Sequence, residues 1–220
     1  MFHSSNCRPW IVAALIALPS LFAAQAAQAD VIYSNFGPGD SYDSGTSWLV
    51  DSSQQVAMPF TVGGGDHRFS SVEVAFNTGD VSNTQIHLLL MSDIGGLPGA
   101  ILETLLVNVD AGSFITMGTS ALQPTLLDGT KYWIATDSSI TPGFSSGWAW
   151  TSPVVSGGFA FSVNAPPPWN TTNKTLGAFR VNGIPFAANE VPEPASIMLW
   201  SLVSAAGLAA WRRRRQVAVA

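Results

Sequence analysis

The chain has few residues whose types and spacing could support catalysis. Residues 143–147 read GFSSG and match the G-x-S-x-G turn, in which a strained backbone lifts a nucleophilic serine toward a histidine later in the chain. No histidine follows Ser145, and turn-forming glycine and serine explain the same letters. Glu73 and Glu103 would suit a glycosidase if their carboxylates lay about 5 Å apart, but both fall at polar positions of expected strands. We therefore assign no catalytic residue and expect a protein that is not an enzyme.

Metal-ligating residues are equally sparse. Beyond residue 29 the chain has two histidines, His67 and His87, whereas a zinc site needs three or four converging nitrogen or sulfur ligands. We expect both histidines to face solvent. Asp40, Asp43 and Asp51 lie in a segment rich in glycine and serine, which could hold calcium weakly through oxygen ligands. Ordinary turns use the same residue types, so calcium is a candidate cofactor with a plain structural alternative.

Tryptophans offer a different chemistry, because an exposed indole can stack on a sugar ring. Between residues 30 and 186 they are Trp48, Trp133, Trp148, Trp150 and Trp169. Trp148 and Trp150 lie two apart in an expected strand, so both must face the same side of its sheet. Trp169 follows three prolines, on a loop that we expect to be rigid and exposed. These three could form a platform for a polysaccharide, or they could fill the core, as we expect of Trp133.

The charge of the chain excludes one class of partner. Between residues 30 and 194 the basic residues are Arg68, Lys131, Lys174 and Arg180, whereas all fourteen acidic residues of the chain lie there. Four positive and fourteen negative charges leave an excess of ten negative charges. Such a surface cannot neutralise phosphates, so we expect no nucleic-acid binding. Docking on anionic lipid headgroups is disfavoured for the same reason.

Short alternating runs separated by turns must position these residues. In residues 69–77 and 84–93 apolar and polar side chains alternate, which indicates half-buried strands. Phe159 and Phe161 likewise share one face of a run. Glycine-rich turns recur about every ten to fifteen residues, which predicts about eight to ten strands. We therefore predict an all-β ectodomain over residues 30–186: an antiparallel β-sandwich, jelly-roll-like.

Residues 1–29 have the organisation of a secretory signal peptide. Arg8 and the amino terminus supply positive charge, residues 10–22 are apolar, and residues 27–29 form a small-x-small cleavage site. The apolar run is too short for a retained membrane anchor, which needs about 20 residues. Cys7, the one cysteine of the chain, lies in this segment. We expect signal peptidase to cut after residue 29 and leave a protein without disulfides.

Three elements follow one another at the C-terminal end. A linker, residues 187–194, ends in Val191, Pro192, Glu193 and Pro194. Its prolines hold the backbone extended. Residues 195–211 carry no charge and predict a transmembrane helix of roughly 25 Å. A basic tail, residues 212–220, begins with Arg212, Arg213, Arg214 and Arg215. The positive-inside rule keeps these arginines in the cytoplasm and places residues 30–190 outside the membrane.

The tetrapeptide, the apolar run and the arginines, in this order, resemble the tripartite PEP-CTERM signal of exopolysaccharide-producing Gram-negative bacteria. The resemblance covers about residues 191–215. It implies that an exosortase, a membrane cysteine protease, recognises the tetrapeptide and cleaves there. The helix would then cross the inner membrane transiently. An ordinary tail anchor would fit the apolar run and the arginines, but it would not need the tetrapeptide.

Residues 31–185 contain motifs that resemble the domain named choice-of-anchor R, which is found attached to PEP-CTERM and other surface anchors. The motifs lie at residues 31–38, 59–61, 91–99 and 129–133. This family carries no assigned activity, so the resemblance implies no catalytic residue.

These features predict an exported, non-enzymatic protein of the cell surface or the extracellular matrix, with a structural or adhesive ectodomain. Its expected partners are signal peptidase, exosortase and, transiently, the inner membrane. The alternative is a carbohydrate-binding module that holds exopolysaccharide through exposed tryptophans, with or without structural calcium. A hydrolase ranks third, because no histidine follows the candidate serine.

Overall fold

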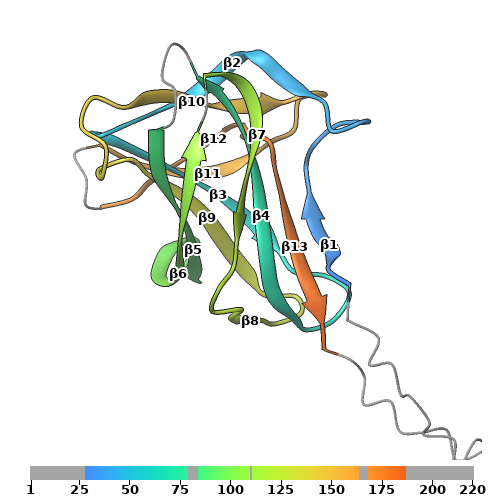
Figure 1. Ribbon diagram of the computed structural model, residues 1–220. Helices are drawn as coiled ribbons and strands as arrows, with labels where there is room; N and C mark the ends of the chain where they lie inside the picture. Colours follow the sequence, from blue (N-terminus) through green and yellow to red (C-terminus); the bar gives the residue numbers. More distant parts are fainter. Residues whose placement is uncertain (1–27, 79–83, 110, 164–167, 187–220) are drawn as a thin grey trace, which may run out of the picture.

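The computed structural model describes residues 28–78, 84–109, 111–163 and 168–186 (Figure 1). The predicted signal peptide up to residue 27, the linker, the transmembrane helix and the basic tail lie outside these residues. Within them every regular element is a β-strand. They include no helix that could span a bilayer. The part of the chain that can be described is therefore all-β, as predicted.

Thirteen strands run through the described residues, and they pair antiparallel throughout. They are β1 (Asp30–Ser34), β2 (Tyr42–Asp51), β3 (Gln54–Thr61), β4 (His67–Thr78), β5 (Thr84–Ile94), β6 (Leu97–Val109), β7 (Gly112–Thr119), β8 (Thr125–Leu126), β9 (Lys131–Asp137), β10 (Ser145–Thr151), β11 (Ser156–Val163), β12 (Asn170–Thr175) and β13 (Phe179–Pro185). The number exceeds the expectation because some strands lack an alternating apolar pattern. β12 reads NTTNKT and is a strand because it pairs with β11.

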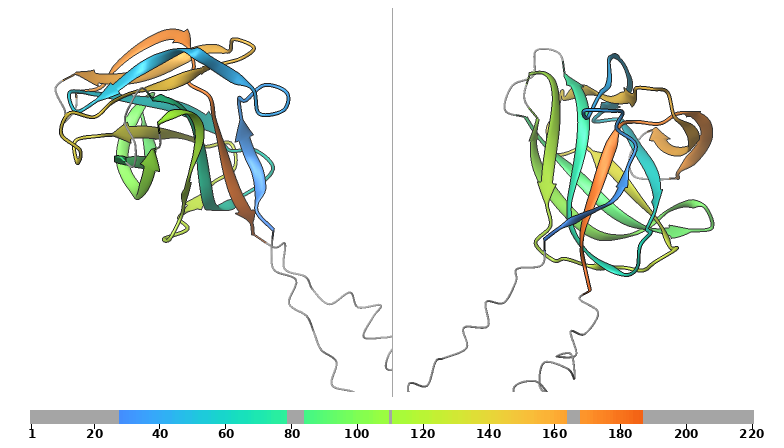
Figure 2. Two further views of the ribbon diagram at one scale, coloured as in Figure 1. Left: turned by 45° about the horizontal axis from the view of Figure 1, so that its top comes forward. Right: turned by 90° about the vertical axis from the view of Figure 1, so that its right-hand side faces the viewer.

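The strands form one hydrogen-bonded network that curves back on itself (Figure 2). One half, here the β3 half, has the order β12-β11-β3-β9-β5-β6. In the other, the β4 half, β4 pairs with β7 and β8 along one edge and with β13 and β10 along the other. β1 lies beyond β13, and β2 lies beyond β10. A sandwich would have two separate sheets, whereas here the β2–β3 hairpin joins the halves through the pair Asp51 and Gln54.

The main core lies between the two halves. Alternate residues of β4 and β5 are fully buried in it: Val72, Val74, Phe76, Ile86, Leu88 and Leu90. The alternation predicted for these strands is confirmed. Because each Å² of apolar surface removed from water contributes roughly 25 cal/mol, this pattern favours the inward orientation of both strands.

Two smaller clusters of buried hydrophobic residues lie on sheet faces that an alternating apolar–polar pattern would predict to be exposed to solvent. Ala57, Ala135 and Ala160 are cross-strand neighbours on the outer face of the β3 half, where they pack with Trp133 and nearby side chains. Trp133 is buried, as predicted. On β4, Ala75 belongs to a second cluster beside the main core. Both faces of the central strands are therefore covered in part.

A junction beside β4 determines how the β4 half is assembled. β13 pairs with β4 up to Val74, and β10 takes the same edge from Phe76 onward. Between them, the Ala178 carbonyl accepts hydrogen bonds from the Ala75 amide at 3.1 Å and from Trp148 Nε1 at 3.0 Å. One carbonyl thus links three strands.

Contacts of Asn35 and Gly177 also stabilise this junction. Asn35, after β1, donates from Nδ2 to the Gly177 carbonyl at 2.9 Å and accepts from the Phe179 amide at 2.7 Å. A Cβ added to Gly177 would lie 2.5 Å from the Trp148 indole. The close approach of backbone and indole therefore requires glycine at position 177.

We expect Gly177→Ala to lower the free energy of unfolding by about 1–3 kcal/mol, because the new methyl group overpacks the Trp148 indole. Gly63→Ala is the matched control, since a Cβ there meets nothing within 4 Å. Urea denaturation of the full-length chain in mild detergent, followed by tryptophan fluorescence, measures both. Equal stability of the two variants would contradict the close packing at Gly177.

Candidate functional site

The predicted three-tryptophan platform does not form. Trp148 is fully buried, with its ring 5.8 Å from that of Phe179 and its Nε1 bonded to a backbone carbonyl. The strand carrying it faces the interior between the two halves, so its indole cannot meet a ligand. The sequence expectation for Trp148 as a glycan-binding residue is therefore corrected.

The other two tryptophans of that prediction lie apart. Trp150 is half-buried, with its ring 5.3 Å from Trp48 and its Nε1 buried without a hydrogen-bond partner among the described residues. Trp169 is also half-buried but packs against the alanine cluster on the outer face of the β3 half. One indole therefore lies on the inner side of the fold and the other on its outer side.

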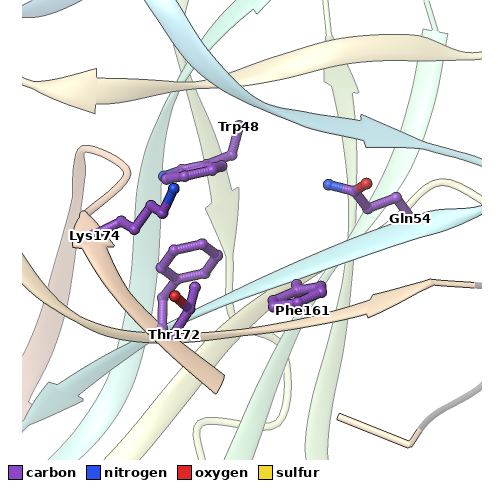
Figure 3. Close-up of a pocket in the computed structure, with 6 residues that line it drawn as sticks. Trp48, Gln54, Phe161, Thr172 and Lys174 are labelled. Atoms are coloured by element: carbon purple, nitrogen blue, oxygen red, sulfur yellow. The ribbon is translucent and has the colours of Figure 1, made fainter. Parts of the chain in front are cut away.

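A cleft of about 290 Å³ opens between β2 and the β11–β12 pair, here called the aromatic cleft (Figure 3). Its lining residues are Trp48, Gln54, Phe159, Phe161, Thr172 and Lys174. Trp48 and Phe161 were not among the predicted site residues. The shared face of Phe159 and Phe161 was visible in the sequence, but their meeting with Trp48 depends on a strand far away in the chain.

Hydrogen bonds and ring contacts hold the aromatic wall in place. Trp48 Nε1 donates to the Thr175 carbonyl of β12 at 2.7 Å. Its ring centroid lies 4.6 Å from that of Phe159, which in turn lies 6.2 Å from that of Phe161. Trp48 and Phe161 are half-buried, so each keeps part of its ring accessible. The cleft therefore presents preformed aromatic surface.

The β2–β3 hairpin positions the polar side of the cleft. The Asp51 carboxylate accepts hydrogen bonds from the amides of Ser53 and Gln54 at 2.7 and 2.8 Å. Burial would raise the pKa of Asp51, but these hydrogen bonds outweigh it and lower the pKa. Gln54 Nε2 donates to the Leu49 carbonyl at 3.0 Å, and its side-chain amide lines the cleft.

A second concavity, here the outer groove, lies on the opposite face of the β3 half. Its volume is about 780 Å³. Leu89 and Met91 lie along it, Trp169 stands at one side, and Asp137 and Gln55 supply polar groups. Trp169, a predicted glycan-binding residue, is therefore placed in a groove, although without Trp148 or Trp150.

The acidic candidates for calcium do not converge. Asp40 pairs with Arg180 at 2.9 Å, Asp43 accepts the Gly45 amide at 2.8 Å, and Asp51 holds the β2–β3 hairpin. The described ranges contain no group of three or more metal-ligating side chains. The geometry thus gives each of the three carboxylates a local structural partner.

The other candidate residues also have structural partners. Glu73 pairs with Arg180 at 2.6 Å, and together with Asp40 it raises the pKa of that guanidinium. Glu103 is buried and accepts the amides of residues 121 and 122 at 2.7 and 2.9 Å. His67 is buried with Nδ1 2.8 Å from the Gly65 carbonyl, so the expectation that it faces solvent is wrong.

Comparison with known families identifies the C-terminal segment. Residues 190–215 match the PEP-CTERM protein-sorting motif. The predicted sorting signal is thereby confirmed, and with it recognition by exosortase and export of the protein. The matched residues do not include 31–185, so the resemblance to choice-of-anchor R stays a prediction. No curated protein and no solved structure matches the chain.

Asp137, which lines the outer groove, should make the stability of the fold depend on pH in the acidic range. Burial would raise the pKa of Asp137, but hydrogen bonds from Ser139, Gln55 and His87 outweigh it and lower the pKa. The stability from these bonds is therefore present above about pH 4, the unfolded value, and is lost as pH falls through the folded pKa. We expect Asp137→Asn to flatten the decline of the urea midpoint below that pH. An unchanged slope would contradict the role of this carboxylate.

Proposed function

We propose that the chain is a non-enzymatic protein of the cell surface or extracellular matrix. A signal peptide exports it, residues 195–211 hold it in the inner membrane, and exosortase cleaves within residues 191–194. The β-stranded ectodomain then takes a structural or adhesive role outside the cell. The observation that carries this proposal is the sorting motif at residues 190–215, which follows directly on the described domain.

The arrangement of the domain supports this proposal. β1 and β13 are antiparallel neighbours, with Asp30 opposite Gly183. The chain therefore enters and leaves the domain at the same end (Figure 1). β2 and the β11–β12 pair, whose residues line the aromatic cleft, lie away from the end at which the chain enters and leaves (Figure 2). A domain tethered at its C-terminal end would thus hold these strands away from the tether.

The sorting step is tested by Glu193→Ala in the native host, with Asn189→Ala as the control outside the matched residues. Because the tetrapeptide is the recognition element, we expect Glu193→Ala to accumulate at full length in the membrane fraction. The control truncates a polar side chain just before residues 190–215 and should be released like the parent chain. Immunoblots of membrane and medium fractions measure both. Release of the Glu193 variant at the parental rate would show that exosortase does not read this residue.

Carbohydrate binding by the ectodomain is a second candidate function. Its support is the aromatic cleft, in which Trp48 and Phe161 offer ring surface beside polar groups of Gln54 and Lys174. Sugar-binding sites need such a mixture, because the faces of a pyranose carry C–H groups while its rim carries hydroxyls. The cleft replaces the Trp148-based platform of the sequence prediction.

A glycan array probed with the purified full-length chain tests this candidate. We expect at least one polysaccharide class to be retained, and we expect the bound glycan to alter the tryptophan fluorescence through Trp48. Retention should persist in a calcium chelator, because the described carboxylates form no metal-binding group. Absence of binding to every glycan would remove this candidate and leave the sorting proposal untouched.

A further inference from the structure

The four basic residues of the ectodomain have different surroundings. Arg180 forms ion pairs with Asp40 and Glu73, and Lys131 Nζ lies 3.6 Å from Asp93 Oδ1. Arg68 lies over the ring of Phe186, with 5.3 Å between its Cζ and the ring centroid. Lys174 has no carboxylate within ion-pair distance among the described residues. The ectodomain, residues 30–186, has twelve acidic and four basic residues, so a cation without a carboxylate partner in it needs an explanation.

The strand pairing of β11 and β12 directs Lys174 into the aromatic cleft. Thr172 lies opposite Phe159, and Lys174 lies opposite Gly157, so Thr172 and Lys174 share the sheet face of Phe159 that lines the cleft. A Cβ added to Gly157 would lie 3.2 Å from the Leu176 side chain, which covers this position. Figure 3 shows the Lys174 side chain reaching toward the Trp48 indole, with Thr172 next to it.

We propose that the aromatic cleft binds a pyranose that carries a carboxylate, a uronic acid unit of a polysaccharide. The sugar ring stacks on Trp48 and Phe161, and Lys174 Nζ donates a charge-assisted hydrogen bond to the carboxylate. Gln54 Oε1 accepts a hydrogen bond from a ring hydroxyl. This assignment rests on the carbohydrate-binding candidate above and names the class of sugar.

The size of the cleft agrees with this ligand. Small-molecule pockets hold roughly 300–1,000 Å³, and the cleft lies at the lower limit with about 290 Å³. Such a volume suits about one or two sugar rings rather than a long acyl chain or a protein segment. Its open side would let the polymer continue beyond the bound unit.

A purely structural role explains Lys174 less well. Lysines on edge strands discourage pairing with other sheets, and β12 is an edge strand. That role requires a charge on the edge but gives no reason for it to face three aromatic side chains. The Lys174 ammonium supplies a local positive charge at the cleft, and this charge favours a carboxylate over a neutral group there despite the negative net charge of the domain.

The test compares a short oligogalacturonide with its methyl ester, which has the same rings but no free carboxylate. Binding to the full-length chain in mild detergent is measured by calorimetry and by tryptophan fluorescence. We expect the free acid to bind about tenfold more tightly than the ester, as one charge-assisted hydrogen bond implies. Lys174→Gln should abolish this difference, and Lys174→Arg should restore most of it. Arg68→Gln removes the same charge elsewhere and should preserve the difference.

Each other outcome has a defined meaning. Equal binding of acid and ester by the parent chain would overturn the uronate assignment while carbohydrate binding stands. Equal losses in Lys174→Gln and Arg68→Gln would also overturn it, because net charge rather than the cleft would then govern binding. Failure of both sugars, together with an empty glycan array, would remove the carbohydrate-binding candidate itself. Circular dichroism of the exposed-site variants verifies that they stay folded.

Discussion

Where β13 leaves the edge of β4 and β10 takes its place, the Trp148 indole lies against Gly177 and donates its Nε1 hydrogen to the Ala178 carbonyl. This contact lets two strands share one edge of β4. β10 then pairs with β2, and Trp48 comes to lie opposite Trp148 in the register. The aromatic cleft therefore depends on a junction that contains none of its own residues.

The acidic composition of the domain serves the fold more than it serves metal binding. Glu103 is buried, where it accepts two backbone amides and the Ser120 hydroxyl. A carboxylate that accepts several hydrogen bonds can stay buried because its charge is shared with their donors. Asp40 and Glu73 hold Arg180 between β4 and the loop before β2. Carboxylates that the sequence suggested as possible ligands therefore accept hydrogen bonds from backbone amides or pair with Arg180.

The sorting motif and the stranded domain occupy different parts of the chain. The sorting signal occupies residues 190–215, outside the stranded domain, and acts through a linear pattern that an enzyme reads. The domain starts and ends at one side, which leaves its opposite end free (Figure 1). Because the sorting motif and the aromatic cleft consist of different residues, we expect that sorting and ligand binding can be altered separately by mutation.

The sorting signal, the all-β class and the inward faces of β4 and β5 could be predicted from the sequence, because each follows from residues close together in the chain. It also indicated that Trp133 would be buried. It misassigned Trp148 and His67, and it did not reveal Trp48 or Lys174 as neighbours. Period-two patterns tell which side chains share a face, but not which face is covered or which distant strands pair. Those choices depend on the non-local β2–β10 and β3–β11 pairings, which are set by packing between segments far apart in the chain and are visible in the folded structure alone.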